Sequence, residues 1–217
     1  MPSYIRNKMN STNSVSRERP DGHCYLGVDV EMLDDQWIAV GLVILHNHEI
    51  VATLEVVNAD VIQTIPSDHH FWSRHPEAVE YMHSISIAEA EAIDSIVNFI
   101  SYAKEKYPRF FAITDNMALD IRILDNILVY HGYHPLSYRS ETLYLQAICT
   151  WSYRLGFLKS YNINSIDLRA LLDIEPLSGI RHTPLYDAIT TVREFIALKN
   201  FIMMKKKRAK FTRIPKY

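Results

Sequence analysis

The chain has 217 residues, of which 48% are hydrophobic and 22% are charged, and its formal net charge is −2. This length and composition suit a single domain with tails and a sizeable core. They exclude a helical membrane protein, because the sequence has no run of about 18 apolar residues. They also argue against a disulfide framework or a thiolate zinc site, because the two cysteines, Cys24 and Cys149, stand far apart.

The charged residues are unevenly distributed along the chain. Residues 199–217 contain eight Lys or Arg residues and no Asp or Glu, which leaves 15 basic and 25 acidic residues, a net of −10, in residues 1–198. The basic end could contact phosphate groups, or it could serve as a solubilising or targeting tail. We expect a disordered tail in residues 1–22, one domain in residues 23–204 and a basic tail in residues 205–217.

Hydrophobic periodicity, capping residues and turn signals divide the domain into strands and helices. The capping-box pattern Ser86-Ile-Ala-Glu89 begins one helix, and Thr183 followed by Pro184 begins the last one. Strands are expected at about residues 25–32, 37–46, 49–57 and 109–114. Helices are expected at about residues 77–82, 86–106, 118–130, 144–155 and 183–207. Antiparallel strands followed by helix, strand and helix predict an α/β domain with a mixed sheet.

The first strand carries two carboxylates in an otherwise apolar segment. Asp29 and Glu31 lie on one face of this strand, and the apolar side chains at positions 26, 28 and 30 lie on the other. A second apolar strand follows directly, which favours an interior position for the first. Because a buried, unpaired charge is costly, we expect the two acids to face a cation. Two solvated acids on an edge strand are the alternative.

Asp120 is the next acid in an unusual position. It lies at helical spacing from the apolar stripe within residues 123–128, so it shares the buried face of its helix. An acid stabilised by the helix dipole at the N-terminus is the simpler alternative. Asp115, at the end of the preceding strand, could take the same role as Asp120, and we favour Asp120.

The third motif is the sequence Arg181-His-Thr-Pro-Leu-Tyr-Asp187. With Thr183 as the N-cap, His182 lies in the preceding loop and Asp187 lies in the first helical turn, so both side chains can converge on one site. An isolated His-x4-Asp pattern is a weak signal, because a lone histidine is more often a surface or capping residue. The pattern gains weight only beside the other acids.

Together these residues form a coherent set of ligands. Asp29, Glu31, Asp120 and Asp187 offer hard oxygen atoms, which favour Mg²⁺ or Mn²⁺ over zinc. Two such ions, ~4 Å apart, can activate a water and stabilise the leaving oxygen of a phosphodiester. His182, with an unperturbed pKa near ~6.5, could accept the proton from that water.

The three motifs resemble those of the DEDD superfamily of 3′–5′ exonucleases, in its histidine-containing (DEDDh) branch. Gly27-Val-Asp-Val-Glu31 resembles the first motif, D-x-E; Ala118 to Leu124 resembles the second; and His182 to Asp187 resembles the third, H-x4-D. The resemblance spans about residues 24–204. It implies an α/β, ribonuclease H-like fold, with a central mixed sheet whose first three strands are antiparallel and with helices flanking that sheet.

The resemblance also implies roles for individual residues. The four acids would hold two Mg²⁺ or Mn²⁺ ions, and His182 would be the general base. Two further segments, Phe71–Ala78 and Ser165–Arg169, are similar to phage exonuclease A and the small bacterial 3′–5′ exoribonucleases. Trp72 could stack on a terminal base or close the core beside the sheet. Arg169 could contact a phosphate or pair with a neighbouring acid.

The leading hypothesis is a metal-dependent 3′–5′ exonuclease that releases nucleoside 5′-monophosphates from single-stranded RNA or DNA. Its expected partner is nucleic acid with a free 3′ end, and no membrane association is expected. A homodimer is also compatible with the sequence. The polar N-terminal segment and the unpaired cysteines favour an intracellular, cytoplasmic location. A viral or phage origin is compatible with that location. The alternatives are a catalytically retired nuclease fold that binds nucleic acid, and a structural protein whose acids hold one stabilising ion.

Overall fold

A computed structural model describes residues 24–107, 110–115, 119–136, 146–149, 172 and 174–211. The strands are β1 (Cys24–Leu33), β2 (Gln36–His46), β3 (Glu49–Val57), β4 (Phe110–Thr114) and β5 (Gln146–Cys149). The helices are α1 (Ala59–Ile62), α2 (Pro76–Ile85), α3 (Glu89–Lys106), α4 (Asp120–Tyr130) and α7 (Pro184–Phe211), with a short 3-10 turn, η1 (Trp72–Arg74). In this part of the chain, no helix is long and apolar enough to cross a membrane.

The strands form one five-stranded sheet in the order β3-β2-β1-β4-β5. β1 pairs with β2, and β2 with β3, in antiparallel register. β4 pairs parallel to β1, and β5 parallel to β4. The predicted mixed sheet with three antiparallel strands at its start is therefore confirmed. Asn47 and His48 form the β2–β3 turn with positive φ angles of 51° and 70°, which match the twist of a two-residue hairpin.

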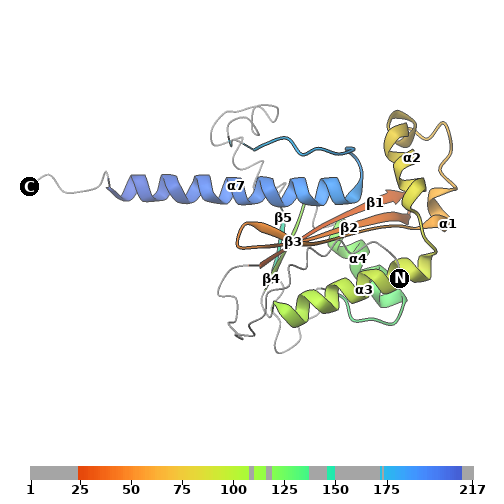
Figure 1. Cartoon of the computed structure of the whole chain (residues 1–217), viewed down its shortest axis with the longest axis horizontal. Coiled ribbons are helices and arrows are strands. Elements are labelled where there is room, and N and C mark those ends of the chain that lie inside the picture. The colour runs from red at the N-terminus through yellow and green to blue at the C-terminus, as the bar shows by residue number, and fades with distance from the viewer. Residues whose placement is uncertain are drawn as a thin grey trace, which may run out of the picture.

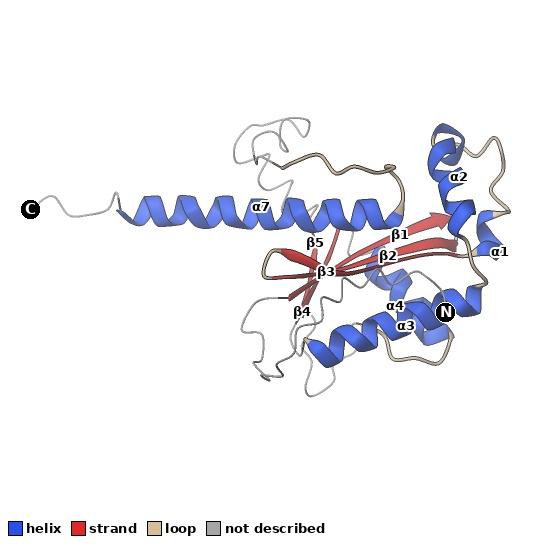
Figure 2. Ribbon diagram, in the orientation of Figure 1, coloured by secondary structure: helices blue, strands red, loops and turns tan. Residues whose placement is uncertain are grey.

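Helices cover both faces of the sheet, with α7 on one side and α3 and α4 on the other (Figure 2). The larger core lies under α3 and α4 and includes Leu26, Val28 and Val30 of β1. The core under α7 contains Ala188, Val192 and Phe195 of that helix, packed against side chains of β1, β2 and β4. The alternation of β1 side chains thus separates the two layers, as predicted, and directs Asp29 and Glu31 to the α7 side.

Two glycines allow α7 to lie close to the sheet. A Cβ atom added to Gly27 would lie 2.4 Å from Val192 Cγ2, and one added to Gly41 would lie 2.2 Å from the carbonyl carbon of Pro184. Only a residue without a side chain fits at either position. The start of α7 is therefore held directly against β2, next to the carboxylates of β1.

The predicted N-cap of α3 is wrong, whereas Thr183 directly precedes α7 as predicted, and its carbonyl accepts from the Asp187 N–H. Ser86 does not cap α3: its hydroxyl donates to the carbonyl of His83 at the end of α2, and the N-cap residue of α3 is Ala88, without a side-chain cap. Glu89 instead accepts a hydrogen bond from Asn58 Nδ2 at 3.3 Å. At the start of α7, the Thr183 hydroxyl donates to the carbonyl of Ile180. Short polar side chains can bond to either flanking turn, so the local pattern alone does not select the partner.

Two segments differ from the helical expectation or lie beyond it. Residues 146–149 form strand β5, which pairs with β4, so the helix expected over 144–155 is wrong there; pairing to a sheet edge overrides the local periodicity. α7 runs to Phe211, beyond the expected end near Lys207. The expected tail in residues 1–22 lies outside the described residues.

Candidate active site

Three carboxylates from two elements meet beside the start of α7. Asp29 and Glu31 of β1 and Asp187 of α7 each offer an oxygen atom, and these atoms all lie within 4.8 Å of one another. We call these three residues the acidic cluster. All three side chains are half-buried. The structure thus brings together residues that are more than 150 positions apart in the sequence, as the motif order predicted.

The backbone explains how the acidic cluster forms. Asp29 and Glu31 are two residues apart in a strand, so their side chains point to the same face. The β1–β2 register shifts directly after Glu31, which marks the point where regular pairing is interrupted. Asp187 lies in the first turn of α7, where its backbone N–H donates to the Thr183 carbonyl at 3.1 Å. The helix start therefore fixes where Asp187 projects over β1.

Asp120 lies beside the acidic cluster as the first residue of α4. It is buried, with 4% of its surface exposed, and its Oδ2 accepts a hydrogen bond from the buried hydroxyl of Thr114 at the end of β4. Its charge raises the pKa of both Asp29 and Glu31. Asp115 acts on Asp29 as well, as the smallest of the contributions to that pKa. Asp120 therefore acts on both carboxylates of β1, and the choice of Asp120 over Asp115 stays a prediction.

The carboxylates destabilise one another's charged forms. Burial, followed by the charges of Glu31, Asp120 and Asp187, raises the pKa of Asp29 well above its usual range. Burial and then the charges of Asp187 and Asp120 raise the pKa of Glu31 to about 8. Among the described residues, the buried Oδ2 of Asp29 has no hydrogen-bond partner.

This donor set fits a divalent cation. The orphaned oxygen of Asp29 points to a missing partner, since buried polar atoms are nearly always satisfied in folded proteins. Several carboxylates within reach of one another supply the hard oxygen ligands that Mg²⁺ and Mn²⁺ prefer. A bound cation would reverse the effect of burial on these pKa values by stabilising the ionised forms.

His182 lies in the loop before α7, packed against other aromatic rings. Its ring centroid is 4.0 Å from that of His75 and 5.4 Å from that of Phe71, which meets it edge-on at 87°. Its φ angle of 61° is in the left-handed region, which is uncommon for a residue other than glycine. Burial, then the neighbouring charges of His75 and Arg181, lower the pKa of His182. The imidazole is therefore favoured in its neutral form.

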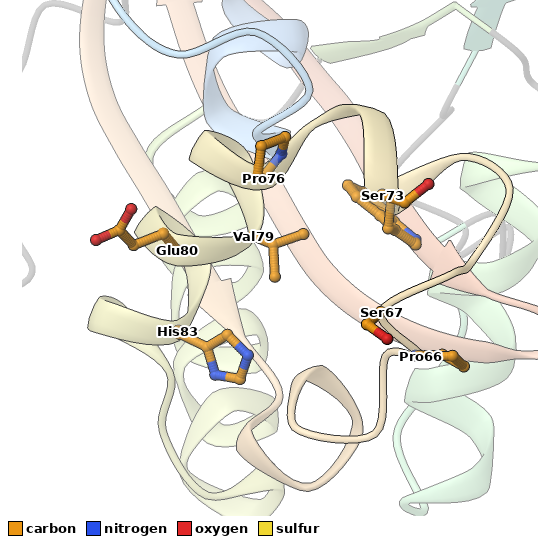
Figure 3. Close-up of a pocket in the computed structure, with 8 residues that line it drawn as sticks. Pro66, Ser67, Ser73, Pro76, Val79, Glu80 and His83 are labelled. Atoms are coloured by element: carbon orange, nitrogen blue, oxygen red, sulfur yellow. The ribbon is translucent and has the colours of Figure 1, made fainter.

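Trp72 is packed in the interior, and only 2% of its surface is exposed. Its Nε1 donates to the carbonyl of Met32, next to Glu31, at 3.1 Å. The ring helps to line a pocket of about 440 Å³ between residues 66–73 and α2 (Figure 3). This position agrees with the alternative prediction, in which Trp72 closes the core beside the sheet. Stacking of Trp72 on a terminal base stays a prediction. Arg169 lies outside the described residues.

Two features of the site were missed by sequence reasoning. The rings of Phe71 and His75 that enclose His182 come from a loop about 110 residues earlier, and nothing in the local pattern connects them. Glu55 of β3 bonds to the start of α7, with Leu185 N–H donating to its Oε1 at 3.2 Å. The available signal for Glu55 was a carboxylate between apolar residues of a strand, which is weaker than the pair formed by Asp29 and Glu31.

No protein-family model and no curated protein sequence matches this chain. Solved structures do match. The nuclease domain of 3′hExo, a DEDDh family member, bound to rAMP, superposes with a TM-score of 0.50 at 11% identity, covering 85% of this chain and 93% of that one. E. coli Exonuclease I, in complex with a 5cy-dA13 oligonucleotide, gives a TM-score of 0.51 at 12% identity. The alignment with the latter covers 82% of this chain and 40% of that chain.

At 11% and 12% identity, these likenesses establish architecture and leave activity to be argued from the site. The shared architecture is the mixed sheet flanked by helices, and the acidic cluster is a candidate metal site upon it. The chain therefore has the ribonuclease H-like fold of the DEDDh exonuclease domains.

Proposed function

We propose that this protein is a metal-dependent 3′–5′ exonuclease that hydrolyses phosphodiester bonds at the 3′ end of single-stranded nucleic acid and releases nucleoside 5′-monophosphates. The observation that carries the proposal is the acidic cluster, whose carboxylate oxygens lie within 4.8 Å of one another. A cluster of like charges is costly unless a cation neutralises it. Its occurrence in a fold shared with a DEDDh nuclease domain supports phosphodiester hydrolysis among the reactions that divalent ions promote.

The ligands would be Asp29, Glu31, Asp120 and Asp187, and they would hold two Mg²⁺ or Mn²⁺ ions. When bound, such ions activate a water molecule and stabilise the oxygen that leaves the phosphorus. Before binding, burial and then the repulsion between the carboxylates raise the pKa of Asp29 and Glu31. The hydrogen bond from Thr114 orients the Asp120 carboxylate. The carboxylate therefore loses less conformational freedom when it binds a metal ion.

His182 would act as the general base in this reaction. A base must be unprotonated at the working pH, and burial with the charges of His75 and Arg181 lowers the pKa of His182 in the required direction. The packed rings of Phe71 and His75 restrict the orientations that the imidazole can adopt.

The substrate is nucleic acid with a free 3′ end. The matched structures were solved with rAMP and with a 5cy-dA13 oligonucleotide, so the proposal covers both RNA and DNA. Trp72 and Arg169 are proposed as substrate contacts, Trp72 through the pocket that its ring helps to line. An unpaired strand reaches a partly buried acidic site more readily than a duplex, which favours single-stranded ends.

The test is digestion of matched RNA and DNA oligonucleotides carrying a 5′ label, single- and double-stranded, with Mg²⁺, Mn²⁺ or chelator. We expect a ladder shortening from the 3′ end, release of nucleoside monophosphates, and no products with chelator. The double substitution Asp29→Asn with Glu31→Gln should abolish the ladder. The matched control is Glu91→Gln with Asp94→Asn, which removes two exposed carboxylates from α3. A wild type that degrades no substrate with either metal would refute the proposal.

A further inference from the structure

Asp29, Gly41 and Glu55 form a row across three strands. In the antiparallel register, Asp29 lies opposite Gly41, and Gly41 lies opposite Glu55. Residues directly opposite one another project to the same face of a sheet. Two carboxylates therefore flank a glycine on the face covered by α7. Asp29 belongs to the acidic cluster, and Glu55 lies two strands away from it, which is roughly 10 Å between the two backbones at the usual strand spacing.

The start of α7 occupies the gap above the glycine. A Cβ atom on Gly41 would lie 2.2 Å from both the carbonyl carbon and the oxygen of Pro184, and 2.5 Å from the nitrogen of Leu185. The backbone at Pro184 thus fills the space that a side chain would take. From this position the N–H of Leu185 points to Glu55 and donates to its Oε1 at 3.2 Å.

Glu55 is held in place from its other side. Its Oε2 accepts a hydrogen bond from the hydroxyl of Tyr81 in α2 at 2.7 Å. Burial raises the pKa of Glu55, and the two hydrogen bonds act against that rise, because each of them favours the charged form. The carboxylate thus connects β3, α2 and the start of α7 through both of its oxygens.

The bond to Leu185 replaces an ordinary N-cap. The first backbone N–H groups of a helix have no partner within the helix, and a Ser, Thr, Asn or Asp at the N-cap usually satisfies one of them. Here the Thr183 hydroxyl donates to Ile180, and the N–H of Leu185 is satisfied by a carboxylate from the sheet. Asp187 lies two residues after Leu185 in the same helical turn. Any loosening of this turn would therefore also displace the Asp187 carboxylate.

We propose that Glu55 is a positioning residue for the metal site: by capping α7 from the sheet, it sets where Asp187 meets Asp29 and Glu31. This role rests on the proposed function, because it assumes that the acidic cluster binds a divalent cation. Glu55 does not belong to the acidic cluster and acts through the backbone of α7. Its loss should loosen the first turn and leave Asp29 and Glu31 in place on β1.

The test is Mn²⁺ binding to the purified full chain, followed by the electron paramagnetic resonance signal of free Mn²⁺, which needs no catalysis. Glu55→Ala removes the cap, and Glu55→Gln keeps an oxygen that can accept from Leu185 but lacks the charge. Tyr81→Phe removes one of the two hydrogen bonds to the Glu55 carboxylate. This variant replaces Glu55→Ala in the test if Glu55→Ala does not fold. Glu49→Gln, an exposed acid of the same strand, is the control for charge alone. Circular dichroism confirms that each variant is folded.

We expect Glu55→Ala to weaken Mn²⁺ binding by about tenfold or more, as outer partners of metal ligands typically contribute ~10–100-fold. Glu55→Gln should recover most of the affinity, Tyr81→Phe should lose a smaller part of it, and Glu49→Gln should match the wild type. Equal losses in Glu55→Ala and Glu55→Gln would show a charge effect and overturn the positioning role, as would unchanged affinity in Glu55→Ala and Tyr81→Phe. If the wild type binds no Mn²⁺, or binds it equally without Asp29 and Glu31, the metal site itself fails and the role of Glu55 fails with it.

Discussion

The mutual repulsion within the acidic cluster predicts how stability depends on pH in the absence of metal. The folded state raises the pKa of Glu31 from an ordinary 4.5 to about 8, and it raises that of Asp29 as well. A raised carboxyl pKa means that the folded state binds the proton more tightly than the unfolded state. The contribution of the Glu31 carboxyl group to the free energy of unfolding is therefore fully present below pH 4.5 and is lost as the pH rises towards 8.

The size of the effect follows from the same values. One extra proton bound by the folded state changes the free energy of unfolding by ~1.4 kcal/mol per pH unit. Between pH 5 and 8 this gives an upper bound of ~4 kcal/mol for Glu31 alone, and its partial exposure to solvent reduces this to about 2 kcal/mol. For a domain of this size, 1 kcal/mol corresponds to roughly 2–4 °C in Tm, so a fall of roughly 4–8 °C is expected.

The assay is thermal unfolding in chelator across this pH range, for the wild type and for Asp29→Asn with Glu31→Gln. The variant retains every other ionisable group, so the difference in Tm between the two proteins isolates the two acids. We expect the wild type to become progressively less stable than the variant as the pH rises. Excess Mg²⁺ or Mn²⁺ at pH 8 should raise the Tm of the wild type only. A difference in Tm that does not change between pH 5 and 8 would refute the reasoning.

Two further predictions concern the groups around the acidic cluster. Thr114→Val removes the donor to Asp120 at nearly constant volume, so we expect about 1–3 kcal/mol lower unfolding free energy in denaturant titrations, together with weaker Mn²⁺ binding; an unchanged midpoint would contradict the role of that hydrogen bond. His75→Ala removes a ring whose charge lowers the pKa of His182 and which helps to bury it. Without His75, the acidic limb of the rate–pH profile should move to higher pH, and an unchanged or lower limb would argue against His182 as the base.

The sequence was sufficient for features that arise from period and burial. Asp29 and Glu31 could be assigned to one face because strand side chains alternate, and β1 is the central strand of the five-stranded sheet. The burial of Asp120 followed from its helical spacing to the apolar stripe of α4 in the same way. These inferences need only local geometry and the cost of burying charge, which hold whatever the rest of the fold is.

Features that depend on tertiary partners could not be predicted. Ser86 formed a convincing capping box with Glu89, yet each bonds elsewhere, because the end of α2 and the side chain of Asn58 compete for them. Glu55 stands 130 positions before the N–H that it accepts from, and no sequence pattern relates the two. The strand at residues 146–149 depends on the free edge of β4, which exists only after the sheet has formed.

The length of α7 has a mechanical consequence. The helix has 28 residues, about 42 Å at ~1.5 Å per residue, and its far end extends well beyond the sheet (Figure 1). The segment from Lys199 to Phe211 carries six Lys or Arg residues. One continuous helix therefore joins Asp187, near its start, to the basic segment at its other end, so the two are held a fixed distance apart by the backbone of a single element.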